Sequence, residues 1–327
     1  MNFNNKRILI TGGAGYIGSH VCLALKQTQA TIAIVDNLST GFESNIHFGT
    51  LHNIDLNDWQ NIDQFIENFK PDAVIHFAGS IVVPESVKHP LKYYQNNTAN
   101  TLNLIRSCEK HHVNNILFSS TAAVYGIPTS GICSETDDLK PINPYGRSKL
   151  MTELMLADSA AASNLNYVAL RYFNVAGAHE SKQLGQRMPD ATHLIKIIAQ
   201  VLTGKRTGMS IYGSDYPTPD GTCIRDYIHV CDLAHAHVLA LNYLLEGGES
   251  TVFNCGYSKG FSVKEVVDAA KQQFGEFSVI ESDRRAGDPP QLIANSERIQ
   301  NILNWTPSHN DLDLIIRSAI EFEQTIS

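Results

Sequence analysis

A short apolar run, a cluster of glycines and an apolar helical pattern follow one another near the start of the chain, and this order constrains the fold more than any other feature. Residues 7–11 are β-rich, and glycines follow at Gly12, Gly15 and Gly18. Such glycines let the backbone turn tightly and approach a pyrophosphate, whose charge is then met by the helix N-terminus. A plain glycine turn is the alternative. The strand before it and the helix after it favour a dinucleotide-binding loop that includes Tyr16 and Ile17.

The residue that ends the next strand indicates which dinucleotide binds. Residues 31–35 form an apolar strand pattern that leads into Asp36. A carboxylate there accepts both hydroxyls of an adenosine ribose and repels a 2′-phosphate. Asn37, Leu38 and the residues up to Gly41 include no arginine or lysine that would reverse this preference. NAD is therefore favoured over NADP, while a turn residue without a ligand is the alternative for Asp36.

Strand and helix patterns alternate through the first half of the chain. Helical patterns are expected over 58–69 and 91–112, and strands over 73–78 and 115–120. This alternation predicts an α/β fold with a Rossmann-like, doubly wound parallel sheet.

Ligands of such sheets bind at the carboxyl ends of the strands. Asp55 and Leu56 end one strand pattern and are expected near the adenine. The next strand ends in Phe77, Ala78 and Gly79, over which the cofactor can pass. Asn96 and Asn97 fit a cofactor contact and a solvated helix face equally well.

A phenol and an ammonium lie four residues apart at Tyr145 and Lys149. Asn143 is a good N-cap and Pro144 suits the first helical position, so a helix carries both side chains one turn apart. A tyrosine titrates near ~10 in isolation, and a neighbouring cation favours its phenolate, which suits a base at neutral pH. A packed ring beside a solvated amine is the alternative.

Hydroxyl groups follow the strand at 115–120. Ser119 and Thr121 belong to a Ser-Ser-Thr run at its carboxyl end, which is a natural donor set beside a substrate hydroxyl or carbonyl. Such runs also cap their own backbone.

Composition narrows the class of protein. The 327 residues carry a formal net charge of −8, which argues against nucleic-acid binding by bulk electrostatics. The six cysteines are scattered without Cys-x-x-Cys spacing, so neither a zinc site nor a disulfide framework is indicated. Residues 1–7 lack an apolar signal region, and no run reaches the ~18 apolar residues of a membrane span. A soluble, cytoplasmic protein without a bound metal is expected.

Two domains are expected. Residues 1–178 form an NAD-binding Rossmann domain to which 226–245 return, and 179–327 form a smaller substrate domain. The second part loses the strict alternation and has a Pro-, Gly- and Asp-rich stretch at 212–222.

Taken together, these motifs resemble the extended short-chain dehydrogenase/reductase family and, within it, the UDP-glucose 4-epimerases, over residues 7–305. The glycine loop and the Tyr-Lys pair are specific to the superfamily, whereas the block at 212–230 is specific to the epimerases. Further matching stretches are 76–79, 84–87, 172–174, 284–288 and 303–305.

The resemblance implies roles for individual residues. Tyr145 is the acid/base, Thr121 hydrogen-bonds the 4-hydroxyl of the sugar, and Lys149 holds the nicotinamide ribose and lowers the pKa of Tyr145. The residues implied along cofactor and substrate are Phe77, Asn96, Tyr172, Phe173 and Asn174. Those implied at the substrate are His193, Leu194, Tyr212 and Leu292, with Arg225, Arg285 and Asp288 at the diphosphate and uridine ribose. Independently of any family, arginines suit a dianionic diphosphate because the guanidinium fork matches phosphate geometry.

The implied activity is the reversible interconversion of UDP-glucose and UDP-galactose through a transient 4-keto sugar, on tightly held NAD. A homodimer through helices at 91–112 and 150–162 is also implied. Three residues depart from the family pattern. Ile81 replaces a lysine near the cofactor, His193 replaces an asparagine at the substrate, and Leu292 stands where side-chain bulk decides whether an N-acetylated sugar fits.

Other functions stay open. An epimerase for another UDP-sugar, N-acetylated, uronate or pentose, shares all of these motifs. A 4,6-dehydratase of nucleotide sugars needs an extra acid and base, and relatives of that kind place Asp-Glu after the threonine, where this chain has Ala122 and Ala123. A non-catalytic NAD-binding regulator would have little need for Tyr145 and Lys149.

Overall fold

The computed structural model describes residues 1–190, 192–285 and 287–326, and the chain divides into two compact units. Unit 1 comprises Met1–Val124, Pro141–Arg171 and Ala234–Phe253, and unit 2 comprises Tyr125–Lys140, Tyr172–Leu233 and Asn254–Ser327. The boundaries differ from the expected 1–178, 226–245 and 179–327. Residues 125–140 belong to unit 2, the main boundary follows Arg171, and the returning segment starts at Ala234.

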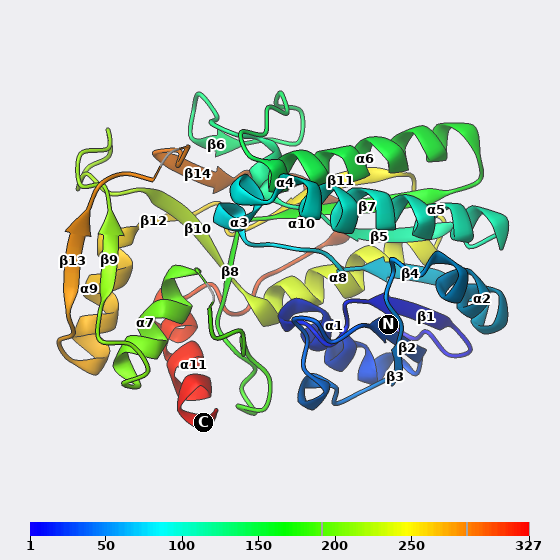
Figure 1. Ribbon diagram of the computed structural model, residues 1–327, viewed down its shortest axis with the longest axis horizontal. Coiled ribbons are helices and arrows are strands. Elements are labelled where there is room, and N and C mark those ends of the chain that lie inside the picture. The colour runs from blue at the N-terminus through cyan, green and yellow to red at the C-terminus, as the bar shows by residue number, and fades with distance from the viewer. Residues whose placement is uncertain (191, 286, 327) are drawn as a thin grey trace. The chain divides into compact units, whose positions relative to one another are not determined.

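A seven-stranded sheet forms the centre of unit 1, in the order β11-β7-β5-β4-β1-β2-β3 (Figure 1). The strands from β7 to β3 pair in parallel, as a doubly wound fold requires. The expected fold class is thereby confirmed. The strands are β1 (Arg7–Thr11), β2 (Thr31–Asp36), β3 (Thr50–Asn53), β4 (Ala73–His76), β5 (Asn115–Ser119), β7 (Asn166–Tyr172) and β11 (Thr251–Cys255).

Helices cover both faces of this sheet. Apolar side chains from α2, α5 and α6 pack with the strands into one buried cluster that includes Ile62, Leu104, Phe118 and Leu156. Helix α8 lies on the other side of β4 and β5 from α5 and α6 (Figure 1). The helices are α1 (Tyr16–Leu25), α2 (Trp59–Phe69), α3 (Val83–Lys88), α4 (Pro90–Tyr93), α5 (Asn100–Lys110), α6 (Pro144–Ala162) and α8 (Val230–Leu245), with short turns η1 (Lys26–Thr28), η2 (Glu43–Asn45) and η4 (Ala122–Val124). Across the described ranges, none of the helices has the length and hydrophobicity that a membrane crossing would need.

The segment expected as one helix over 91–112 is interrupted. Helix α4 passes into a π-helical stretch, η3 (Tyr94–Ala99), before α5 begins at Asn100. The prediction of one continuous α-helix is therefore wrong. A π turn adds a residue per turn, and such turns are often found at functional sites.

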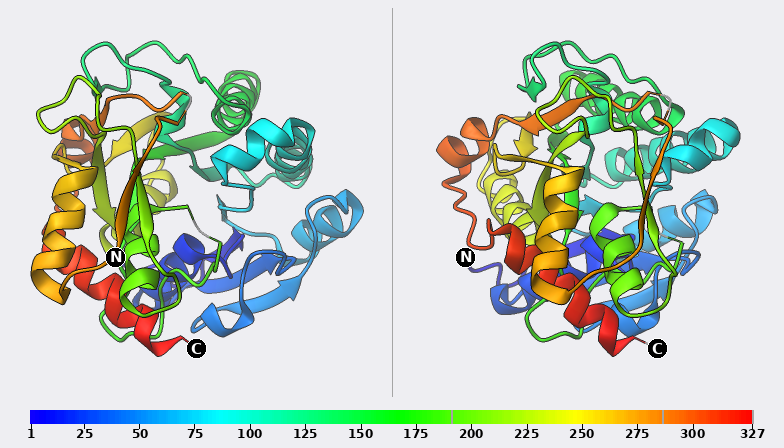
Figure 2. Two further views of the ribbon diagram at one scale, coloured as in Figure 1. Left: turned by 60° about the vertical axis from the view of Figure 1, so that its left-hand side comes forward. Right: turned by 90° about the vertical axis from the view of Figure 1, so that its left-hand side faces the viewer.

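Unit 2 contains a five-stranded sheet and a separate two-stranded one. The larger sheet has the order β12-β10-β14-β6, with β8 paired to β10, and the smaller one pairs β13 with β9. Helices α7, α9 and α11 lie side by side and share a buried apolar core (Figure 2). The elements are β6 (Ile132–Cys133), β8 (Asn174–Ala176), α7 (Leu194–Leu202), β9 (Met209–Tyr212), β10 (Ile224–His229), β12 (Gly260–Ser262), α9 (Val263–Phe274), β13 (Val279–Ser282), β14 (Gln291–Ala294), α10 (Glu297–Leu303) and α11 (Leu312–Thr325).

A buried carboxylate, Asp232, joins several segments of unit 2. It accepts hydrogen bonds from the Tyr257 hydroxyl (2.6 Å), from Nδ1 of His309 (2.7 Å) and from the Ser308 amide (3.1 Å). The Trp305 indole donates to the main-chain carbonyl of Asp232 (3.1 Å). Burial alone would raise the pKa of Asp232, but these hydrogen bonds outweigh it and hold the pKa below its usual value.

Replacing this carboxylate should therefore destabilise the protein in a pH-dependent way. Because the folded-state pKa is depressed, the stability that Asp232 contributes is present above the unfolded-state pKa of ~3.9 and is lost as the pH falls through the folded-state pKa. Asp232→Asn should lower the free energy of unfolding at pH 7 by about 2–4 kcal/mol, because amide hydrogens would face hydrogen-bond donors. Denaturant titrations at several pH values should show this difference shrinking below pH ~4.

The exposed Asp138, which pairs with Lys140, is the control. Asp138→Asn should leave the unfolding midpoint unchanged, since exposed ion pairs contribute little. Equal midpoints for the wild type and Asp232→Asn at pH 7 would contradict this account of Asp232.

Candidate active site

The glycine loop of unit 1 brings two backbone segments into close contact. The amides of Phe77 and Ala78 donate to the Thr11 carbonyl at 2.9 and 3.1 Å. Gly12 has φ of +72°, and a Cβ on it would lie 2.6 Å from the Ala78 nitrogen, so only glycine fits there. Gly15 is the N-cap of α1 and provides no side chain to cap the helix end. This cradle of backbone at a helix N-terminus fits the pyrophosphate of a dinucleotide.

Asp36 and its neighbours lie at the carboxyl ends of β2 and β3. The Asp36 carboxylate accepts from the amides of Ala14 (3.0 Å) and Leu38 (2.9 Å). Burial raises the pKa of Asp36, and these two hydrogen bonds oppose the rise. Asn37 donates its amide to Asp55 at 2.9 Å. A carboxylate has about four lone-pair sites, so Asp36 can still accept hydrogen bonds from ribose hydroxyls. The structure thus brings together Asp36, Asn37 and Asp55, which were predicted to bind the adenosine part of the cofactor.

The π-helical stretch η3 directs two asparagines to the turn after β4. The Asn96 amide donates to the Ser80 hydroxyl (2.9 Å), so it lies against this turn and not on a solvated face. Asn97, for which the sequence left the same two alternatives open, accepts from the Ser80 amide (2.7 Å) and donates to the Ser148 hydroxyl (3.0 Å). Ser148 precedes Lys149 on α6, so Asn97 ties α6 to the Gly79–Ser80 turn.

Helix α6 begins as predicted and buries Tyr145 in its first turn. Asn143 is the N-cap and accepts from the Gly146 amide (2.9 Å), with Pro144 at the first helical position. The Tyr145 phenol is hydrogen-bonded to the Thr121 hydroxyl. The ring of Tyr93 meets that of Tyr145 edge-on, with 6.4 Å between centroids. Burial raises the pKa of Tyr145, and the Thr121 hydrogen bond opposes this rise.

Lys149 lies one turn later and is also buried. Its Nζ donates to the Ser119 carbonyl (2.9 Å) and lies 4.9 Å from the centre of the Phe118 ring. Burial lowers the pKa of Lys149 to about 8, and the nearby Glu153 opposes this. The expected fall in the pKa of Tyr145 beside Lys149 is absent from the structure, because the desolvation of the phenol dominates.

A buried ion pair lies behind these residues and was not predicted. Nη2 of Arg171 on β7 lies 2.6 Å from Oε2 of Glu153, and its Nε lies 3.0 Å from Oε1. The Ser120 hydroxyl also donates to Glu153. Glu153 continues the four-residue spacing of Tyr145 and Lys149 along α6, and this spacing was the available signal.

Unit 2 contains the predicted arginines. Nη2 of Arg225 lies 2.8 Å from Oδ1 of Asp288, and Arg225 is paired with Leu292 in the register of β10 and β14. The Arg285 guanidinium lies 3.8 Å from the ring centre of Tyr212. Ala286, within the matching stretch 284–288, lies outside the described residues.

The other residues predicted at the substrate also belong to unit 2, and Ile81, a departure from the family pattern, is exposed. Strand β7 ends at Tyr172 and β8 begins at Asn174, and Phe173, the residue that joins them, is buried. His193 is the N-cap residue of α7 and Leu194 its first helical residue. Burial lowers the pKa of His193.

Known proteins resemble this chain over nearly its full length. The model of the NAD dependent epimerase/dehydratase family matches residues 8–256. A UDP-glucose 4-epimerase of Azospirillum brasilense is 52% identical over 322 residues, which is 98% of this chain and 92% of that protein. A UDP-glucose 4-epimerase from Brucella ovis, solved in complex with NAD, is 43% identical, with a TM-score of 0.94 and 98% of both chains covered. A UDP-Glc/GlcNAc 4-epimerase from Campylobacter jejuni is 50% identical, with a TM-score of 0.86, over 98% of this chain and 100% of that one.

The chain thus combines the glycine cradle, the carboxylate after β2 and the buried Tyr-Lys pair on α6 with similarity to its relatives over nearly its full length. The chain belongs to the NAD dependent epimerase/dehydratase family.

Proposed function

We propose that this protein catalyses the reversible 4-epimerisation of UDP-glucose and UDP-galactose with bound NAD. The observation that carries the proposal is the buried Tyr145 phenol, hydrogen-bonded to Thr121 and one helical turn from Lys149. A pair of this kind suits removal of a proton from an alcohol and its later return. The similarity to UDP-glucose 4-epimerases at up to 52% identity supports the choice of reaction and substrate.

The chain's own residues perform the binding and the proton transfer. When bound, NAD would supply the redox chemistry, namely reversible hydride transfer at C4 of the sugar. Tyr145 accepts the 4-hydroxyl proton as the 4-keto sugar forms and gives it back after the sugar has turned. Thr121 orients that hydroxyl. The Lys149 ammonium would hold the nicotinamide ribose. The proposed cofactor contacts are Gly12, Gly15, Tyr16, Ile17, Gly18, Asp36, Asn37, Leu38, Asp55, Leu56, Phe77, Ala78, Gly79, Asn96, Ser119 and Tyr172.

The reaction requires asymmetric binding of the substrate. We assign the diphosphate and uridine ribose to Arg225, Arg285 and Asp288, because charge-assisted hydrogen bonds hold that end strongly. The hexose must be held weakly enough to present either face of C4. The other proposed substrate contacts are Phe173, Asn174, His193, Leu194, Tyr212 and Leu292.

Two alternatives have less support. A 4,6-dehydratase needs an additional acid and base beside the sugar, and Thr121 is followed by Ala122 and Ala123 in the short turn η4. A non-catalytic NAD-binding regulator would not need a buried phenol paired with a threonine hydroxyl.

We further propose that the protein acts in the cytoplasm as a homodimer. All six cysteines are free thiols, which suits a reducing compartment. The layer of helices α3 to α6 exposes large apolar side chains, namely Val87, Leu91, Leu102, Met151 and Leu154. Exposed apolar side chains on one helical layer favour association with a second copy of the same layer.

Removing the phenolic oxygen of Tyr145 tests the proposed reaction. Tyr145→Phe should fold and retain NAD, but kcat for UDP-galactose should fall by about 10²–10⁴, the usual contribution of a general acid/base. A coupled assay of UDP-glucose formation measures the rate, and the absorbance of released cofactor measures NAD content. The matched control is Tyr243→Phe, since Tyr243 lies on α8 in the same unit and packs edge-on against Phe253. Parental activity in Tyr145→Phe would exclude Tyr145 as the base.

The sugar specificity is tested by assaying UDP-galactose, UDP-N-acetylgalactosamine and UDP-glucuronate in parallel. Leu292 is paired with Arg225 in the sheet, and the similar enzyme of Campylobacter jejuni is described for both glucose and N-acetylglucosamine nucleotides. We therefore expect turnover of the N-acetylated substrate in addition to UDP-galactose. Leu292→Tyr should lower kcat/KM for the N-acetylated substrate about tenfold or more while sparing UDP-galactose, because added bulk excludes the acetamido group. An equal loss for both substrates would argue against Leu292 as the determinant.

Light scattering on the purified protein tests the dimer. The expected mass is twice the 36.1 kDa of the chain. Leu91→Asp combined with Leu154→Asp should shift the protein towards the monomer, because each places a charge on the proposed interface. Ile280→Asp, at an exposed apolar position on β13, is the control and should leave the mass unchanged. A monomeric wild type would refute the proposal.

A further inference from the structure

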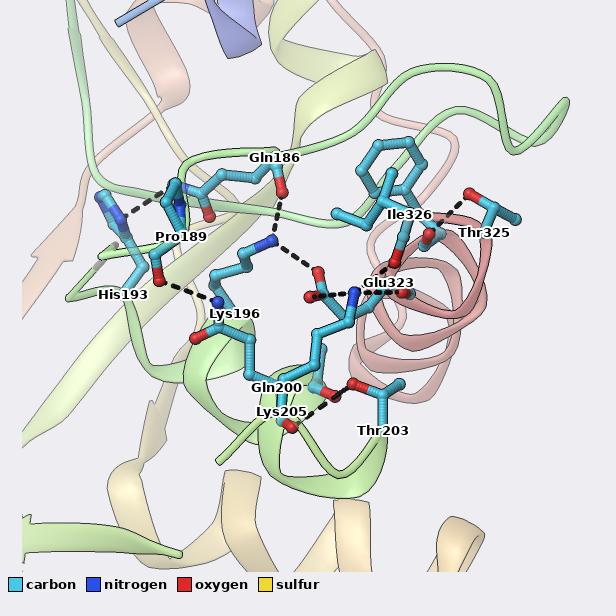
Figure 3. A network of polar contacts seen from close by, with 12 residues as sticks. Gln186, Pro189, His193, Lys196, Gln200, Thr203, Lys205, Glu323, Thr325 and Ile326 are labelled. Atoms are coloured by element: carbon cyan, nitrogen blue, oxygen red, sulfur yellow. Dashed lines mark hydrogen bonds and ion pairs between the residues drawn. The ribbon is translucent and has the colours of Figure 1, made fainter. Parts of the chain in front are cut away.

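Lys196 lies at the centre of a buried polar network in unit 2 (Figure 3). Its Nζ lies 2.5 Å from Oε2 of Glu323 on α11 and donates to the Gln186 carbonyl, also at 2.5 Å. The Lys196 and Glu323 side chains are only 5% and 2% exposed. Burial lowers the pKa of Lys196, and the hydrogen bond that Lys196 donates to Glu323 opposes this. A buried ion pair is retained at such a site only when further hydrogen bonds satisfy it, and the Gln186 carbonyl provides one.

The segment that receives this hydrogen bond, residues 186–189, belongs to no helix or strand and precedes His193 in the chain. Its carbonyl groups are bound by side chains of α7. Lys196 takes the Gln186 carbonyl, and the Gln200 amide donates to the Pro189 carbonyl at 2.9 Å (Figure 3). The Arg187 guanidinium lies 5.3 Å from the ring centre of Phe322 on α11. The segment from 186 to 189 is thus held at both carbonyls by the helix that follows it.

The side chain of Gln186 contacts the imidazole ring of His193 and restricts which ring nitrogen can carry the proton. Its Nε2 lies 3.1 Å from Nδ1 of His193 (Figure 3). An amide nitrogen only donates, so Nδ1 must accept and the imidazole proton must sit on Nε2. Burial, which lowers the pKa of His193, keeps the ring neutral. The ring then has a single N–H donor, at Nε2.

We propose that Lys196 and Gln186 are positioning residues that fix His193 as a neutral Nε2–H donor to an oxygen of the sugar nucleotide. Lys196 fixes the main chain of Gln186, and the Gln186 amide sets the tautomer of His193. The contact with the sugar nucleotide rests on the proposed function, whereas the tautomer does not. An asparagine at this position would have offered both a donor and an acceptor. The histidine held in this tautomer offers the sugar nucleotide only a donor.

The chain offers a matched pair of lysines for the test. Lys196 and Lys205 both pair with Glu323, the latter at 3.0 Å. The other described side-chain hydrogen bonds of Lys205 go to the carbonyls of Glu323 and Ile326, and not to the segment at 186–189. Lys196→Met and Lys205→Met therefore make the same chemical change at the same carboxylate, and each leaves one lysine to neutralise it. Only Lys196→Met releases Gln186.

The first readout is the His193 ring itself, observed by NMR in protein labelled with ¹⁵N-histidine and assigned by comparison with His193→Asn. The wild type should show the Nε2–H tautomer and a pKa below the ordinary value near ~6.5. Lys196→Met should give a mixture of tautomers, while Lys205→Met should match the wild type. A wild-type ring protonated on Nδ1, or an unchanged tautomer in folded Lys196→Met, would overturn the proposal.

The second readout is kinetic and separates positioning from general loss of structure. Lys196→Met should raise KM for UDP-galactose about tenfold, roughly the loss of one hydrogen bond, with little change in kcat or bound NAD. A fall in kcat and NAD content together, with KM unchanged, would show a structural role only.

Two substitutions at Gln186 keep the proposal testable if Lys196→Met does not fold. Gln186→Leu removes the side-chain amide but keeps the carbonyl bound by Lys196, so it should free the tautomer and raise KM. Gln186→Glu should raise the pKa of His193, because a carboxylate beside the ring favours the imidazolium. If the folded variants show neither of these changes, the proposal is refuted. Absence of epimerisation by the wild type would refute the proposed function instead, since the NMR result does not depend on turnover.

Discussion

The ion pair between Glu153 and Arg171 joins helix α6 to strand β7 deep inside unit 1, and the geometry of the proposed catalytic residues depends on it. Two charges buried in this way are tolerated only with near-complete hydrogen bonding, which the two-pronged contact and the Ser120 hydroxyl provide. Lys149 lies one helical turn before Glu153 and is fixed to the Ser119 carbonyl. The same helix is therefore tied to both β5 and β7. These contacts add to the apolar packing of α6 in fixing its rotation and its height above the sheet, and so help to place Tyr145 beside Thr121.

Local features of the fold could be read from the sequence because few residues determine them. The glycine loop, the carboxylate after β2 and the start of α6 at Asn143 each depend on neighbours within a few positions. The parallel sheet followed from the alternation of patterns. By contrast, the pKa of Tyr145 depends on how much water the folded chain removes from it, which spacing alone does not reveal. Arg171 was passed over for a related reason, since a lone arginine in a strand pattern carries no sign of its partner on another element.

Unit 2 was harder to predict because its ordering contacts link distant parts of the chain. Glu323 on the last helix holds Lys196, and through it the segment before α7, across more than a hundred residues of sequence. That segment looks like a polar loop when read alone. The segment is held in place because side chains of α7 bind its main-chain carbonyls. Contacts of this kind cannot be predicted from a pattern of residue types. Arg225 and Asp288 were named from family resemblance, and their direct contact appears only when β10 and β14 are adjacent.

The π-helical stretch Tyr94–Ala99 has a consequence for how the chain tolerates changes in length. An α-helix turns by about 100° per residue, so the extra residue of a π turn offsets α5 from α4 by roughly that angle. Deleting one residue there would let α4 and α5 join as a regular helix. Asn96 and Asn97 would then rotate away from the Ser80 turn, although every side chain in the segment would still be helical. The number of residues in this stretch, and not only their identity, therefore sets the rotation of α5 relative to α4.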